Sequence, residues 1–281
     1  MTKKKSSISK IILFLICVVI ILIYGFNRIK DRLPRKLINV IAPTKITVMT
    51  YDINHGMGSD NVYNLSRISK VIKSESPHLV ILNEVDYKTK RGFNDEQARR
   101  IAAELGMEFT FSRNYPIDGG WTGNAILSKF PIEFAENKIY KQDYGHDTKS
   151  LLHVIVNIGN IKVHVYGTQL SSDSIASSNQ VKELLNFVFE WGNDSPVIIG
   201  GNFGMTPDYK RIYEMAYYFT DVGAYFQVDE FTYPASNPYL RLDYLFSNKL
   251  VMPLKIKVVD NEVTRLASDH LPVVAHFKIL H

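Results

Sequence analysis

The chain has 281 residues, of which 46% are hydrophobic and 22% are charged, which excludes a disordered protein; its single cysteine excludes an intramolecular disulfide framework. Lysine and arginine number 33 against 28 acidic residues, a formal net charge of +5. Residues 1–36 carry nine basic side chains and one acidic one, whereas the rest of the chain carries 24 and 27. A basic N-terminal segment therefore joins a mildly acidic body, which is not typical of a protein that coats nucleic acid.

Residues 11–27 contain no charged side chain and are mostly isoleucine, leucine, valine and phenylalanine. As a helix this segment would be about 25 Å long, the short end of a membrane crossing, and the flanking Lys10 and Arg28 can extend toward the lipid headgroups. The bulky residues Ile23–Phe26 offer no signal-peptidase site. A buried core helix is the alternative. We predict a basic N-terminal tail over 1–10, a transmembrane signal anchor over 11–27 and a linker over 28–45.

The orientation of this predicted anchor follows from the length of its tail more than from its charges. Four lysines precede the apolar segment and five basic residues follow it closely, so the positive-inside rule hardly discriminates. A very short N-terminal tail favours an N-inside arrangement. We predict a single-pass protein of the cell membrane, with the C-terminal domain extracytoplasmic.

The body, residues 46–281, reads as one α/β domain. The helical patterns cluster on particular connections and the C-terminal third is nearly all strand, which favours mixed sheets over a doubly wound parallel sheet. In chain order, the expected elements are strand 46–53, helix 62–75, strand 78–85, helix 94–106, strands 108–113, 123–128, 150–158 and 161–170, helix 177–191, strand 196–201, helix 206–218, and strands 240–247, 252–259 and 272–279.

Acidic side chains occur at or near the ends of several apolar strands. Asp52 follows one strand, Glu84 lies inside another, and Asp243 begins a third. Asp269 and His270 directly precede the last strand. A buried glutamate costs several kcal/mol unless it is paired or bound to a metal. Each group alone is typical of a strand cap or a surface ion pair, but together they predict an oxygen-rich cation site.

Nine short motifs follow one another along the body, and each alone is weakly informative. They are Thr50–Gly56, Leu82–Val85, Arg91 with Asp95 and Gln97, Gly123–Ser128, Thr168–Leu170, Gly200–Gly204, Thr232–Pro234, Arg241–Tyr244 and Ser268–Pro272. Their order and spacing resemble the endonuclease/exonuclease/phosphatase family, which contains DNase I-like nucleases, inositol-polyphosphate phosphatases and neutral sphingomyelinases. The resemblance implies a four-layer α/β sandwich of two mixed β-sheets flanked by helices, here preceded by one transmembrane helix, with the active site on loops at one end.

The resemblance also implies roles for individual residues. Glu84 would be the principal ligand of Mg²⁺, with Mn²⁺ as an alternative, because a hard cation that keeps several waters suits one carboxylate in an open site. Asp52 would strengthen cation binding, and Asp269 would support the metal or its waters. His270 would hydrogen-bond the phosphate, with Asp243 fixing its tautomer and favouring its protonated form.

Four positions depart from the family pattern. Asp52 stands where the family has asparagine, and Gln169 where it has histidine. Asn202 and Gly204 replace the aspartate and asparagine of its Gly-Asp-x-Asn signature. Asn202 cannot act as a base near neutral pH, and Gln169 cannot shuttle a proton. Loss of the water-activating carboxylate would cost about 3–5 kcal/mol of transition-state stabilisation, unless Asp52 replaces that charge.

These observations support two main hypotheses. The first is a membrane-tethered, Mg²⁺-dependent phosphodiesterase or phosphatase that acts on a lipid headgroup or another phosphorylated small molecule. The second is a pseudoenzyme that binds a metal or a phosphorylated ligand without turnover, as the replacements at 169, 202 and 204 suggest. A nuclease is a lesser alternative, because the body has no basic run to follow a nucleic-acid backbone. The sequence gives no indication of the oligomeric state.

Overall fold

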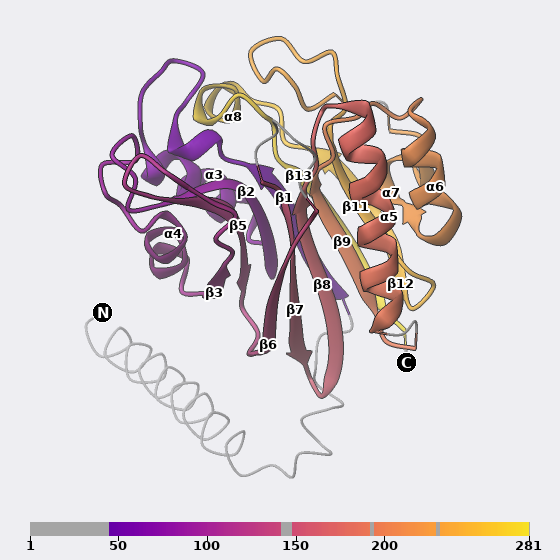
Figure 1. Ribbon diagram of the computed structural model, residues 1–281. Coiled ribbons are helices and arrows are strands. Elements are labelled where there is room, and N and C mark those ends of the chain that lie inside the picture. Colours follow the sequence, from indigo (N-terminus) through magenta and orange to yellow (C-terminus); the bar gives the residue numbers. More distant parts are fainter. Residues whose placement is uncertain (1–44, 142–147, 192–193, 229–230, 281) are drawn as a thin grey trace, which may run out of the picture. The chain divides into compact units, whose positions relative to one another are not determined.

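A computed structural model of the chain describes residues 45–141, 148–191, 194–228 and 231–280 (Figure 1). The predicted tail and anchor, and the predicted linker up to residue 44, lie outside the described residues. Among the helices that the structure does describe, none is long and apolar enough to cross a membrane.

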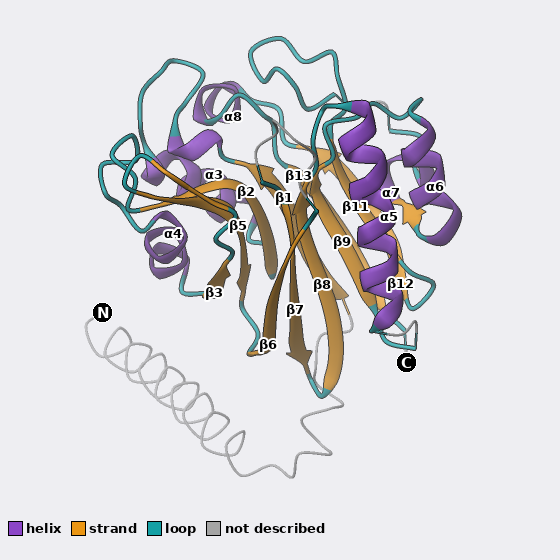
Figure 2. Cartoon of the chain, in the orientation of Figure 1, coloured by secondary structure: helices purple, strands orange, loops and turns teal. Residues whose placement is uncertain are grey.

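Two mixed β-sheets form the centre of the body (Figure 2). The first has the order β12 (Val251–Val258), β13 (Val273–Ile279), β1 (Lys45–Asp52), β2 (Leu79–Tyr87), β5 (Gly120–Ser128) and β3 (Glu108–Phe111), with β4 (Tyr115–Ile117) also paired to β5. The second has the order β10 (Thr220–Asp221), β11 (Asp243–Ser247), β9 (Val197–Asn202), β8 (Ile161–Gln169), β7 (Ser150–Ile158) and β6 (Ile132–Ile139). Within them, β1–β2 and β8–β9 are parallel pairs and the other pairs are antiparallel.

Helices cover the outer face of each sheet (Figure 2). Apolar side chains of α3 (Leu65–Glu75), α4 (Gln97–Leu105) and α8 (Glu262–Ala267) pack with those of β1 and β2. On the second sheet, α5 (Ser174–Glu190) and α6 (Lys210–Tyr218) pack against β8, β9 and β11. Two short elements, η1 (Asn54–Gly56) and α7 (Val222–Tyr225), follow β1 and β10.

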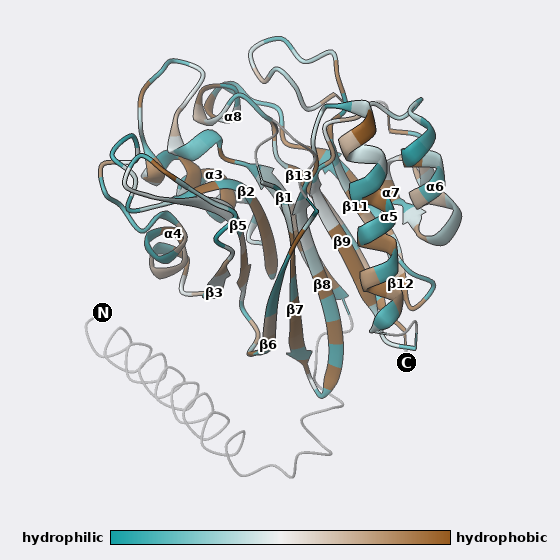
Figure 3. Cartoon of the chain, in the orientation of Figure 1, coloured by the Kyte–Doolittle hydropathy of each residue, from teal (hydrophilic) through white to brown (hydrophobic). Residues whose placement is uncertain are grey.

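The alternation of side chains along the strands builds three buried layers. In β2, Leu79 and Ile81 face the second sheet, and Val80 and Leu82 face the helices. The strands β2, β7 and β9 are accordingly mostly hydrophobic, whereas the helices are mixed (Figure 3). The helix–sheet–sheet–helix arrangement expected from the sequence is confirmed.

Most predicted elements are confirmed with shifted ends, and the unexpected ones are short or at a sheet edge. The strand β6 pairs only with β7, and its side chains are exposed or only partly buried, so it carries no apolar run. The elements β4, β10, η1, α7 and α8 have at most six residues each, too few to show a period. The strand predicted over 240–247 begins at Asp243.

The parallel pairs bring four strand ends to one end of the sandwich. Since parallel strands share a direction, the ends of β1 and β2 lie together, as do those of β8 and β9. Gly201 permits the close approach of β9 to β8: its φ is +142°, and a Cβ there would lie 1.8 Å from the carbonyl oxygen of Thr168. Four of the predicted site residues, Asp52, Glu84, Gln169 and Asn202, lie at or near these ends.

A histidine pair is buried between the second sheet and α5. His153 Nε2 lies 3.1 Å from His164 Nδ1, and the His153 ring stacks on Tyr166 at 4.3 Å. His153 is fully buried, and its Nδ1 has no hydrogen-bond partner among the described residues. Burial, and secondarily the positive charge of a protonated His164, lower the pKa of His153 to about 3.

This pair should make the fold sensitive to acid. Because the folded-state pKa lies below the ordinary value of 6.5, the stability contribution is complete above pH 6.5 and is lost as the pH falls toward 3. We expect acidification to pH 4 to cost about 2–3 kcal/mol through His153. Urea unfolding of wild type and His153→Gln at several pH values measures this, and equal pH slopes in the two proteins would contradict it.

Candidate active site

The seven predicted site residues converge at one end of the sandwich. Asp52, Gln169 and Asn202 are the last residues of β1, β8 and β9, and Glu84 lies near the end of β2. Asn202 is the register partner of both Gln169 and Asp243, the first residue of β11. The loop before β13 is joined to β1 by the Ser268 hydroxyl, which donates to the Asp52 carbonyl at 2.8 Å. This loop carries Asp269 and His270.

Glu84 occupies an unusual backbone conformation. Its φ is +52°, in the left-handed region that a residue with a Cβ rarely adopts. The register between β2 and β5 shifts between Leu82 and Val85, so Glu84 lies in an irregularity of the ladder. Glu84 is consequently partly exposed in a strand whose neighbouring residues are buried. Backbone conformations of this kind cost about 1–3 kcal/mol and persist where surrounding contacts impose them.

The contacts that impose it come from Asn83. Its amide nitrogen donates to Asn124 Oδ1 and to the carbonyl of Thr168, both at 2.9 Å, and its Oδ1 accepts from the backbone N–H of Asn202 at 2.9 Å. Asn83 is fully buried. One side chain of the first sheet, one residue before Glu84, therefore binds β8 and β9 of the second sheet.

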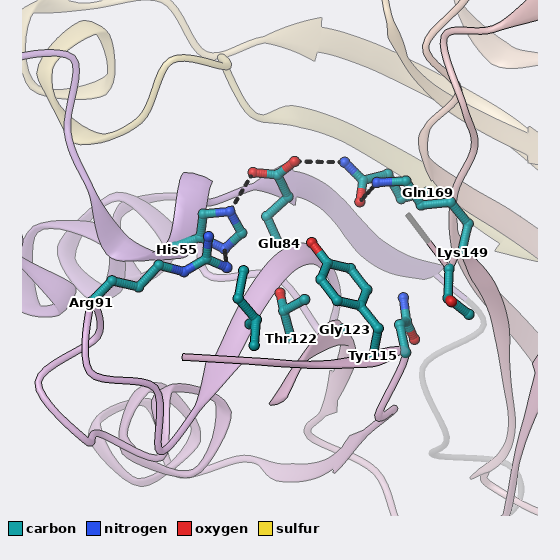
Figure 4. A pocket seen from close by; sticks show the side chains of 11 residues that line it. His55, Glu84, Arg91, Tyr115, Thr122, Gly123, Lys149 and Gln169 are labelled. Carbon is teal, nitrogen blue, oxygen red and sulfur yellow. Dashed lines mark hydrogen bonds and ion pairs between the residues drawn. The ribbon is translucent and has the colours of Figure 1, made fainter. Parts of the chain in front are cut away.

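Both carboxylate oxygens of Glu84 accept from polar side chains (Figure 4). His55 Nε2 lies 3.1 Å from Oε2, and the Gln169 amide donates to Oε1 at 2.8 Å. On its other side, His55 Nδ1 lies 3.2 Å from Asp86, which also forms a two-point ion pair with Arg91. Burial opposes charge on His55, but its bonds to Asp86 and Glu84 raise its pKa to about 9. Burial also opposes ionisation of Glu84, but His55 and Gln169 lower its pKa to about 2.

Asp52 forms a buried pair with Asn202. The Asn202 amide donates to Asp52 Oδ2 at 3.0 Å, and the Gln169 amide lies 3.5 Å from the same oxygen. Asn202 is itself fixed by the Gly204 N–H, which donates to its Oδ1 at 2.9 Å. Burial, followed by the charge of Glu84, raises the pKa of Asp52 to about 7. One carboxylate and one amide thus face each other at the ends of β1 and β9.

His270 is buried beside Asp243, with Nδ1 2.8 Å from Asp243 Oδ2. Burial would lower the pKa of His270, but the charge of Asp243 raises it to about 10, so the imidazole is a cation at neutral pH. The ring of Tyr233 lies 4.7 Å from the imidazole. The predicted orientation of His270 by Asp243 has the geometry that this role requires.

The carboxylates have the chemistry of a magnesium site. Asp52 and Glu84 both lie within reach of the Gln169 amide nitrogen, and mutual repulsion contributes to raising the pKa values of Asp52 and Asp269. Mg²⁺ typically binds through one or two carboxylates and keeps several waters. In the part of the chain that the structure describes, no group of three or more His, Cys, Asp or Glu side chains is placed to hold a metal. Asp52, Glu84 and Asp269 therefore fit the ion by donor type but are not preassembled as a three-residue set.

The site opens into a cleft with two lobes that share Glu84, Lys149 and Gln169. The first lobe, of about 300 Å³, lies toward β4 and β5. The second, of about 420 Å³, extends toward Asn202 and Tyr233. The Lys149 ammonium donates to Gln169 Oε1 at 3.0 Å and so lies at the junction of the lobes.

The chain is similar to known proteins in sequence and in fold. The profile of the Endonuclease/Exonuclease/phosphatase family matches residues 49–270. The chain belongs to this family. Members of the family are hydrolases that act on phosphoesters and commonly use divalent metal ions. In sequence, the chain is 24% identical over 258 residues to YbhP, an uncharacterized protein of Escherichia coli (strain K12), covering 83% of this chain and 96% of YbhP.

Solved structures of the family share the fold. The mannosyl-6-phosphatase of Bacteroides thetaiotaomicron aligns with a TM-score of 0.68 and 14% identity, over 83% of this chain and 99% of that one. The human Nocturnin catalytic domain with bound sulfate aligns with a TM-score of 0.66 and 17% identity, over 84% of this chain and 95% of that one. At these identities the likeness shows the DNase I-like fold alone.

Three basic residues of the cleft lining were not among the predicted site residues. His55 and Arg91 belong to motifs noted in the sequence. Each is a polar residue in a segment that follows a core strand, and this position could have indicated a site residue. Lys149 lies one residue before β7 and belongs to no motif, so only the fold reveals that it faces Glu84 and Gln169.

The pKa of His270 should depend mainly on Asp243. We expect Asp243→Asn to lower it from about 10 to about 7–9, because the charge and hydrogen bond of Asp243 outweigh the more distant Asp52 and Asp269. An NMR titration of the His270 imidazole in metal-free buffer measures this. Asp269→Asn is the control and should produce the smaller change; an equal change in the two variants would contradict the assignment.

Proposed function

We propose that the protein is a metal-dependent phosphoesterase that hydrolyses a phosphodiester or phosphomonoester of a lipid headgroup or small molecule, tethered to the membrane by residues 11–27. The observation that carries the proposal is that Glu84 and Asn202 line an open cleft, with the buried Asp52 bonded to Asn202 and the buried His270–Asp243 pair beside Tyr233, which lines the same cleft. The phosphatase among the structural neighbours supports an ester of a hydrophilic alcohol.

Each protein group has a distinct part in this proposal. Glu84 and Asp52 would hold Mg²⁺, which would neutralise phosphoryl charge and polarise a water. Cationic His270 donates a hydrogen bond from Nε2 to a phosphate oxygen, because its Nδ1 is engaged by Asp243. Asn202 orients the Asp52 carboxylate through its amide. The site therefore binds the phosphate with a cation and positions its carboxylates on fixed strand ends.

The Asp52–Asn202 pair can compensate for the water-activating aspartate that Asn202 replaces. In the family pattern implied by the sequence, asparagine stands at 52 and aspartate at 202. Here the two types are exchanged, and the 3.0 Å contact joins them in one pair. We propose that the negative charge has moved across this pair and that Asp52 supplies it.

An exchange of the two side chains tests this directly. Asp52→Asn leaves two amides and should lower kcat about 10²–10⁴-fold, whereas the double variant Asp52→Asn with Asn202→Asp restores one carboxylate and should regain activity to within tenfold of wild type. The measurement is turnover of a panel of phosphomonoesters and phosphodiesters with Mg²⁺ or Mn²⁺.

A pseudoenzyme is the second candidate, favoured by the engagement of both Glu84 oxygens with protein donors. It predicts no turnover by wild type on any ester, and turnover only after the reversion Gln169→His, Asn202→Asp and Gly204→Asn. Gly204 has φ +61°, a conformation that asparagine tolerates better than most residues, so this reversion is compatible with the backbone.

A further inference from the structure

Large apolar side chains are exposed on several loops around the mouth of the cleft. Phe93, Ile175 and Tyr239 each lie within three residues of a residue that lines the cleft. Their exposed fractions are 68%, 70% and 59%. They belong to three separate connections, after β2, after β8 and before β11, and the sheet topology brings these connections to the site end of the sandwich.

The helix α8 connects β12 to β13 at the same end (Figure 1). Its Val263 and Leu266 lie one turn apart, and about half of each side chain is exposed. The loop before α3 is joined to this helix, because the Ser59 hydroxyl donates to the Arg265 carbonyl at 2.6 Å, and this loop carries the exposed Val62. We call the six exposed residues the apolar rim: Val62, Phe93, Ile175, Tyr239, Val263 and Leu266.

Two arginines near the rim are compensated by ion pairs. Arg67 lies 2.9 Å from Asp60, and Arg265 lies 2.6 Å from Asp260. Exposed apolar groups that gather on one face mark a contact with a partner or with a membrane. Because these charges are already paired, attraction of the rim to a lipid surface would come from apolar burial and would not require anionic lipid.

The part of the chain before β1 favours a bilayer as the partner. It contains the uncharged segment 11–27, for which the sequence predicts a membrane crossing, followed by residues 28–44, which would span about 55 Å if fully extended. The 8 residues of β1 span about 27 Å, so this connection is long enough for either end of the body to meet the lipid. A folded protein seated on the rim would cover the mouth of the cleft, whereas a fluid headgroup layer keeps it accessible to ligands.

We propose that the apolar rim docks on the surface of a phospholipid bilayer, so that the mouth of the cleft lies at the level of the headgroups. Phenylalanine, tyrosine and leucine are side chains that enter the boundary between headgroups and acyl chains. The proposal rests on the membrane tether of the proposed function and adds the end of the body that meets the lipid.

Quenching of a fluorescent label by lipid tests the docking without requiring turnover. The full chain with Cys17→Ser, which removes its single cysteine, is reconstituted into dioleoylphosphatidylcholine nanodiscs that contain doxyl-labelled lipid. A nitrobenzoxadiazole label is attached to Leu266→Cys, Tyr239→Cys or Lys249→Cys. Lys249 is exposed in the turn between β11 and β12, at the opposite end of the sandwich. We expect the labels at 266 and 239 to be quenched at least threefold more than the label at 249.

A pair of matched double variants tests whether the rim itself causes the docking. Val263→Asp with Leu266→Asp should reduce quenching of the label on Tyr239→Cys at least threefold. The control is Tyr213→Asp with Tyr217→Asp, which changes two exposed residues of α6 and adds the same charge, and it should leave the quenching unchanged. The thermal midpoints of both variants establish that each is folded.

Equal quenching at the three positions, or stronger quenching at 249, would overturn docking through the apolar rim. A label at 266 whose emission is shifted to the blue but is not quenched would also overturn it, because a second copy or another protein would then cover the rim. Failure of the proposed hydrolysis would appear separately, as absent turnover by a protein whose rim labels are quenched.

Discussion

The buried amide of Asn83 joins the two sheets at the end where the site lies, and the geometry of the site depends on it. Through one side chain, β2 binds β5, β8 and β9. These bonds lie in a fully buried environment, where an unpaired amide would cost several kcal/mol. They therefore fix the position of one sheet relative to the other at this end. Glu84 is the next residue after Asn83, and we attribute its left-handed backbone conformation to the bonds that fix Asn83. A shift of either sheet would move Glu84 away from Gln169 and Asn202 away from Asp52.

The electrostatics of the site follow from this arrangement. Arg91, Asp86, His55 and Glu84 form a connected series of ionisable side chains, in which Arg91 also contacts His55 Nδ1 at 3.0 Å. The neutral Gln169 amide then connects Glu84 to Lys149. The bonds from His55 and Gln169 keep the partly exposed Glu84 ionised. Asp52, whose hydrogen-bond donors among the described residues are two side-chain amides and one backbone N–H, instead has a raised pKa. The two carboxylates thus differ in character because their partners differ.

The sequence alone predicts the layered fold and the family, because the strands are long apolar runs and the polar residues at their ends keep a fixed order. The strand-end positions of Asp52 and Glu84 predict that these two carboxylates share a site, and the family resemblance adds Gln169 and Asn202 to it. The sequence does not predict the contact of Asp52 with Asn202, which are 150 residues apart. The sequence also does not predict Lys149 as a cleft residue, because a single lysine before a strand is common in proteins and only the fold places it near Glu84. The edge strand β6 is missed because solvent on its outer side removes the apolar pattern.

The most direct measurement is phosphate release from a panel of phosphoesters by the full chain with Mg²⁺, compared with the isosteric Glu84→Gln variant. Glu84 is placed by the hydrogen bonds of the neighbouring Asn83 side chain and not by its own charge, so the variant should retain the fold and its thermal midpoint. We expect wild type to turn over at least one phosphoester and Glu84→Gln to lose at least 100-fold of that rate. No turnover by wild type on any ester, or an undiminished rate in a folded Glu84→Gln protein, would contradict a phosphoesterase site centred on Glu84.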